Sequence, residues 1–90
     1  MAIHSPHENI SEAIFHLVTA ADPMPQRACD AYMIAIRGDT RSGFEVEFRA
    51  LDKIFGSIRQ DEVTSRLRLE DARHGAEILL EMYNSLLIKY

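Results

Sequence analysis

The stretch from residue 61 to residue 90 contains no proline, and it constrains the fold more than any other feature. Apolar residues recur in it at spacings of three and four, which places them on one face of a helix with about 3.6 residues per turn. These residues are Leu69, Ala72, Ala76, Leu79, Tyr83, Leu86 and Tyr90. A helix with such a face has to pack against other elements. The stretch therefore predicts one long C-terminal helix, beginning at Asp61 or as early as Ile58, that the rest of the chain covers.

Two helices are predicted in the first 36 residues. Residues 6–20 form the first, because Ser5, Pro6 and Glu8 suit a helix start and apolar residues then recur at helical spacing. The prolines at positions 23 and 25 end it, since proline lacks the N–H group that a helix interior needs. The second helix covers residues 26–36, and its scarcity of polar residues predicts that it is largely buried.

Residues 32–48 fit two different structures. The Ser42 to Glu45 segment resembles a helix start, and five apolar residues then lie on one face, which predicts a third helix over residues 43–57. Those five are Phe44, Phe48, Leu51, Phe55 and Ile58. A β-hairpin is the alternative, because apolar residues alternate in 32–36 and again in 44–48. The alanines of the preceding segment favour the helix, since alanine is a poor strand residue.

The predicted fold is thus all-α, a small three- to four-helix bundle with a long C-terminal helix and a single helical domain over residues 1–90. The alternative is an α+β fold with a hairpin at about 32–48. Within the last helix, Gly75 costs about 1 kcal/mol relative to alanine. Close packing of a neighbouring helix beside Ala72 and Ala76 is the simplest reason for a glycine there, and a bend is the other.

Charge and composition narrow the classes of function. A net charge of −4 argues against a general nucleic-acid surface, which needs a basic stripe to displace counterions from phosphate. The single cysteine, Cys29, excludes an internal disulfide and stands among apolar neighbours, so we expect it to be buried. No apolar run reaches the ~18 residues of a membrane span, and we therefore expect a cytoplasmic protein with no membrane partner.

No pattern of residues predicts catalysis, and we expect neither an enzyme nor a cofactor. The chain has no Glu-x-x-His pair of the kind that binds metal in helical bundles, and its histidines and glutamates fall on expected solvent faces, so no metal site is predicted. His74, followed by Gly75 and Ala76, is the one candidate for phosphotransfer, but the lysine that usually follows such a histidine is missing.

The last helix carries more apolar residues than one face requires. Leu67, Ile78 and Met82 lie far around the helix from the Leu69 to Leu86 face, and Ile88 lies between. Such a helix is either buried at the centre of a monomer or paired with another molecule. We expect the second, with a protein interface made by Leu67, Ile78, Met82, Leu86 and Ile88.

The predicted function is that of a small, non-catalytic protein-binding regulator or adaptor of bacterial type. It would act through an apolar face of its C-terminal helix, as a homodimer or by binding the helix of another protein. The alternative is a helix-turn-helix DNA-binding regulator, whose phosphate contacts would come from Arg59, Arg66, Arg68 and Arg73.

Overall fold

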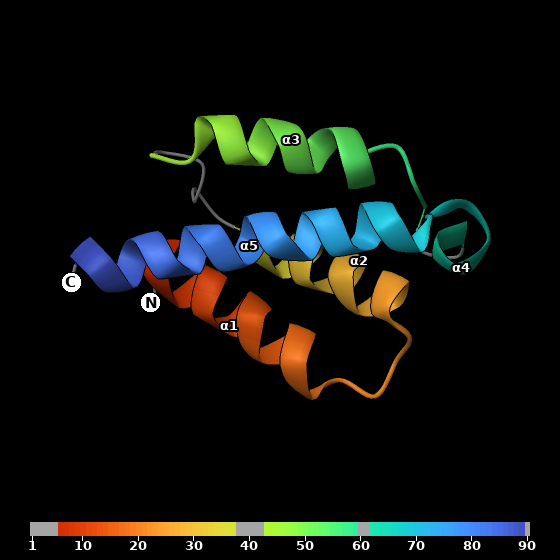
Figure 1. Ribbon diagram of the computed structural model, residues 1–90, viewed down its shortest axis with the longest axis horizontal. Helices are drawn as coiled ribbons and strands as arrows, with labels where there is room; N and C mark the ends of the chain where they lie inside the picture. Colours follow the sequence, from red (N-terminus) through yellow and green to blue (C-terminus); the bar gives the residue numbers. More distant parts are fainter. Residues whose placement is uncertain (1–5, 38–42, 60–61, 90) are drawn as a thin grey trace.

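The computed structural model describes residues 6–37, 43–59 and 62–89, and every regular element among them is a helix. Three helices of 11 to 14 residues, one short turn and one helix of 21 residues follow one another (Figure 1). They are α1 (Pro6–Thr19), α2 (Met24–Ala35), α3 (Glu45–Phe55), α4 (Val63–Arg66) and α5 (Leu69–Lys89). The all-α prediction is confirmed. The hairpin is wrong, because residues 32–35 and 45–48 are helical.

Hydrogen bonds join α1 and α2 at both ends of their antiparallel pair. The buried Asn9 side chain donates through Nδ2 to the Arg37 carbonyl at 2.6 Å. At the other end, Arg27 Nη1 donates to the Leu17 carbonyl at 3.1 Å. Pro23 and Pro25 separate the two helices as predicted, and Pro25 lies in the first turn of α2, where a missing N–H group costs nothing.

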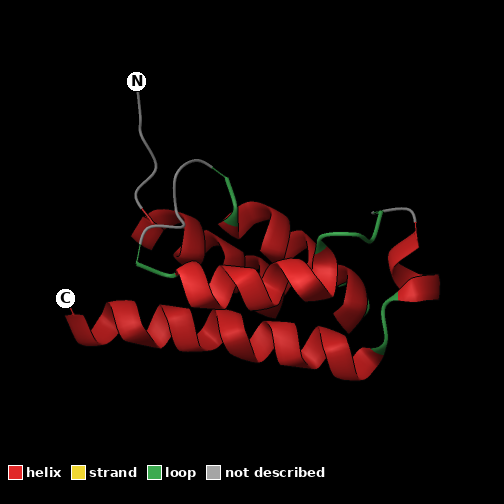
Figure 2. Cartoon of the chain, turned by 90° about the horizontal axis from the view of Figure 1, so that it is seen from above, coloured by secondary structure: helices red, strands yellow, loops and turns green. Residues whose placement is uncertain are grey.

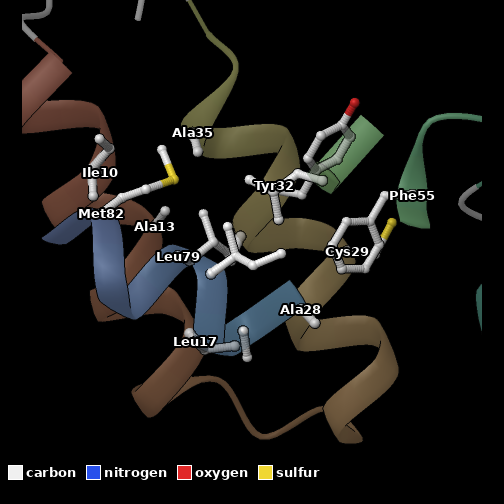
Figure 3. Close-up of a cluster of buried hydrophobic side chains, with 14 of the residues drawn as sticks. Ile10, Ala13, Leu17, Ala28, Cys29, Tyr32, Ala35, Phe55, Leu79 and Met82 are labelled. Carbon is white, nitrogen blue, oxygen red and sulfur yellow. The ribbon is translucent and has the colours of Figure 1, made fainter. Parts of the chain in front are cut away.

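Small residues make α2 the innermost helix of the bundle. It contacts each of the other four helices, and five of its residues are buried. Three of these are alanines, which let neighbouring backbones approach closely. Figure 3 shows Ala35 beside Met82 of α5 and Cys29 beside Phe55 of α3. The expectation that this segment is largely buried is confirmed for Ala28, Cys29, Ala31, Tyr32 and Ala35.

The third helix covers the bundle with the apolar face expected from the sequence. Phe44, Phe48, Leu51 and Phe55 are buried, and Ile58 is half-buried. The helix itself is shorter than the predicted 43–57, because Gly43 adopts a φ of 89°, which ends helical geometry before Phe44. Ser5 and Ser42, which the sequence predicts at the starts of two helices, lie outside the described residues.

Tyr32 connects α2 to α3. Its hydroxyl donates to Asp52 Oδ1 at 2.7 Å, and its ring lies 5.2 Å from the Phe55 ring, centroid to centroid. Figure 3 shows both rings at one end of the core cluster. The aromatic contact and the hydrogen bond together fix α3 against α2.

The C-terminal region differs from the single unbroken helix that the sequence predicts. The four-residue turn α4 is followed by Leu67 in an extended conformation, with φ −91° and ψ 118°, and only then does α5 begin. Val63 and Leu67 are both buried. The break lets α4 turn onto α2, which it contacts, with both of these side chains inside.

The long helix α5 forms one outer layer of the bundle (Figure 2) and contacts α1, α2 and α3. Gly75 is buried in it, and a Cβ added there would overlap the Phe55 ring of α3. A neighbouring helix does pack closely on Gly75, as predicted, and it does so through the side chain of Phe55.

Candidate functional site

Four of the five residues predicted at a protein interface lie in the protein's own core. Leu67, Ile78, Met82 and Leu86 are each less than 10% exposed. Figure 3 shows Met82 pointing into the cluster beside Ile10 and Ala35. Ile88 lies in α5, but its side chain is outside the described part of the structure. Because the folded chain itself covers these four side chains, a partner cannot contact them.

The reason is that α5 packs on three helices instead of one. Its buried positions run from Ile78 through Gly75 and Leu79 to Ala76, an arc of about 160° at roughly 100° per residue. Ile78 and Met82 lie opposite the Leu69 to Leu86 face when the helix is considered alone, but in the bundle they are buried. The alternative of a helix buried by the chain itself is the one that the structure supports for these residues.

Three leucines on one edge of that arc remain accessible. Leu69 is 49% exposed, Leu80 40% and Leu87 52%. They lie within about 20° of one another around the helix axis, at roughly 100° per residue. The half-buried Tyr83 lies between them and the core. We call Leu69, Leu80 and Leu87 the leucine stripe.

Helical periodicity places Leu69 on the inward face and does not distinguish Leu80 or Leu87 from other apolar residues. The signal was present, because Leu80 and Leu87 are seven residues apart and Tyr83 lies between them, which is heptad spacing. It could not be separated from the core pattern, since the helix is apolar over much of its circumference. Only the positions of the other helices show which apolar residues are left outside.

Carboxylates border the stripe on the side away from the core. Glu70, Glu77 and Glu81 are exposed, and they lie about 60–120° around the helix from the leucines. Arg73 is exposed and is the basic residue nearest the line of the stripe. An ion pair in this region joins Arg68 Nη2 to Glu70 Oε1 at 3.9 Å, between two highly exposed side chains, and contributes little.

A second feature lies between α1 and α2. A depression of about 290 Å³ is lined by His16, Asp30, Met33, Ile34 and Arg37. His16 Nε2 lies 3.5 Å from Asp30 Oδ2, and Gln26 donates to the other carboxylate oxygen at 2.8 Å. The lining mixes one imidazole, one carboxylate and one guanidinium, and Asp30 already has partners within the protein. Of these groups, His16 approaches Asp30, and Arg37 approaches Glu12 at 4.0 Å, across the two helices.

The histidine considered for phosphotransfer is exposed on α5, but its small neighbours serve packing. Gly75 lies against Phe55 and Ala76 is buried, so neither gives a partner access to the imidazole of His74. In the ranges 6–37, 43–59 and 62–89, no three His, Cys, Asp or Glu side chains are grouped so that they could hold a metal ion.

Cys29 is buried, as expected. Burial raises the pKa of its thiol above the ordinary value of 9.0, and the neighbouring Asp30 carboxylate raises it further. The thiolate, which is the reactive form, is therefore disfavoured. The side chain behaves as a small apolar residue of the core.

The arginines of the DNA-binding alternative do not form an uncompensated basic surface. Arg59, Arg66, Arg68 and Arg73 are all exposed. Arg66 pairs with Glu62 at 3.6 Å and Arg68 with Glu70, so acidic groups accompany them.

Comparison of the chain with models of protein families, with curated proteins and with solved structures finds no match. Among the described residues, no helix is both long enough and apolar enough to cross a membrane.

Proposed function

We propose that this protein acts without catalysis, as a small regulator or adaptor that binds another protein through the leucine stripe. One observation carries the proposal: three large apolar side chains are accessible and aligned on one edge of the longest helix. Most other apolar side chains in the described part of that helix are buried. Single exposed leucines are ordinary on a protein surface, but an aligned set marks a surface that another molecule can cover.

The shape of the surface favours a helical partner. An amphipathic helix binds by laying apolar residues spaced by three, four and seven against a matching line. Leu80, Tyr83 and Leu87 have that spacing, and the line from Leu69 to Leu87 is about five turns long. The partner is either a second copy of this chain, which would make the expected homodimer, or the helix of a different protein.

Two measurements test the proposal. Size exclusion with light scattering over a dilution series reports self-association. Titration with a helical peptide of about 20 residues, carrying leucine at heptad spacing and uncharged glutamine beside it, reports binding of a foreign helix. We expect at least one of the two associations, and we expect Leu80→Asp to abolish it.

Variants separate the stripe from the fold. Leu80→Asp and Leu87→Asp change accessible side chains and should keep the helical circular dichroism signal. Val46→Asp is the matched control, because Val46 is 74% exposed on α3. Met82→Asp, by contrast, puts a charge in the core and should unfold the protein. A monomer that binds no peptide refutes the proposal, and so does association that Leu80→Asp and Leu87→Asp leave unchanged.

A further inference from the structure

We infer that the occupant of the leucine stripe is a cationic amphipathic helix of another protein. The inference rests on the proposed function and adds the chemistry of the partner. It comes from the charges beside the stripe and from the length of the stripe.

The charge beside the stripe is mainly negative. Glu70, Glu77 and Glu81 follow the leucines along the exposed side of α5, and each is accessible. Arg73 opposes them and Arg68 pairs with Glu70 at 3.9 Å, so three carboxylates stand against two guanidinium groups and the balance stays negative. A helix lying on the leucines would place its own flanking side chains next to these carboxylates, where lysine or arginine is attracted and glutamate is repelled.

The same charges disfavour a second copy as the occupant. Each copy has a net charge of −4 and would bring the same acidic flank to the contact. Like charges beside an interface slow encounter and suppress a wrong partner. A partner of opposite charge gains from both effects.

The stripe also sets the length of the partner. Leu69 and Leu87 are separated by about 18 residues, which is about 27 Å along a helix. An occupant that covers all three leucines therefore needs about five helical turns, with apolar residues at spacings of three and four and basic residues beside them.

Two helical peptides of about 20 residues provide the test. Both carry leucine at heptad spacing, and they differ only in having lysine or glutamate at the flanking positions. Binding to the full chain is measured by fluorescence anisotropy at two salt concentrations. We expect the lysine peptide to bind at least tenfold more tightly than the glutamate peptide, and we expect its affinity to fall with added salt because exposed charges are screened.

A charge reversal tests the flank itself. Glu77→Lys should weaken binding of the lysine peptide about fivefold. Glu12→Lys is the matched control, since it makes the same charge change on α1, where Glu12 lies 4.0 Å from Arg37. Binding of the lysine peptide in Glu12→Lys should stay within about twofold of the unchanged chain.

The outcomes separate this inference from the proposed function. Equal binding of both peptides, or equal weakening by Glu77→Lys and Glu12→Lys, overturns the cationic partner, while loss of binding in Leu80→Asp keeps the stripe as a binding surface. A dimer that Leu80→Asp dissociates also overturns the cationic partner and keeps the stripe. If no peptide binds and the chain is monomeric, both ideas fail.

Discussion

Replacing Gly75 with alanine tests whether the contact between α5 and α3 is as close as the structure shows. Alanine is the better helix former by about 1 kcal/mol, so the substitution would stabilise an uncrowded helix. The added methyl group, however, overlaps the Phe55 ring. The two effects oppose each other, and their sum decides the sign.

The crowding is expected to exceed the gain in helix propensity. Phe55 is 2% exposed, and its ring lies against Tyr32, so it has little room to move aside. Inserting a methyl group into a packed core costs about 1–3 kcal/mol. The net result is a decrease of about 1 kcal/mol in the free energy of unfolding, between about 0 and 2. For a domain of this size that lowers Tm by about 4–8 °C.

Thermal and urea denaturation followed by circular dichroism measure the change. Phe55→Leu provides the second background, because it removes the ring atoms that a Cβ at position 75 would meet. In that background we expect Gly75→Ala to stabilise the protein by about 0.5–1 kcal/mol, since only the propensity remains. If Gly75→Ala stabilises both backgrounds equally, α3 does not approach α5 as described.

Two further predictions concern buried polar groups. Asn9→Ala leaves the Arg37 carbonyl without its 2.6 Å donor and should lower the free energy of unfolding, measured by urea denaturation, by about 1–3 kcal/mol. The control Asn84→Ala changes an exposed side chain and should alter it by no more than about 0.5 kcal/mol. Equal effects of the two substitutions would contradict the role of Asn9. For Cys29 the folded-state pKa is raised, so below about pH 9.0 the thiol is protonated in both states and does not affect stability. Above that pH the unfolded chain loses the proton first, and the free energy of unfolding should fall with rising pH. Cys29→Ala should lack this part of the fall, and a wild type that follows the same pH curve as Cys29→Ala would show that the thiol is not buried.

Helical periodicity was enough to predict the secondary structure of most of the chain. The prolines at 23 and 25 separate two helices, and the phenylalanine face of α3 outweighs the alternating pattern of a strand. The glycine at position 75 also had a reason visible in the sequence, because a glycine between alanines costs helix stability unless another group comes close. These are local effects, and a local pattern contains them.

The binding surface could not be predicted in the same way. The helix α5 carries more apolar residues than one packed face can hold. Periodicity, however, gives only the directions of these side chains relative to one another around the helix axis. Ile78 and Met82 were assigned to an outer face, and Leu69 to the inner one, because the sequence does not contain the positions of α1, α2 and α3.

Apolar residues at helical spacing are enough to show a helical bundle with a long last helix rich in apolar side chains. Which of those side chains are inside follows from the arrangement of all the helices. Burial depends on where neighbouring helices lie, so packing against α1, α2 and α3 covers Ile78, Met82 and Leu86 and leaves Leu69, Leu80 and Leu87 accessible. The break at Leu67 has the same origin, because the gain from burying this leucine appears only when the rest of the core is present.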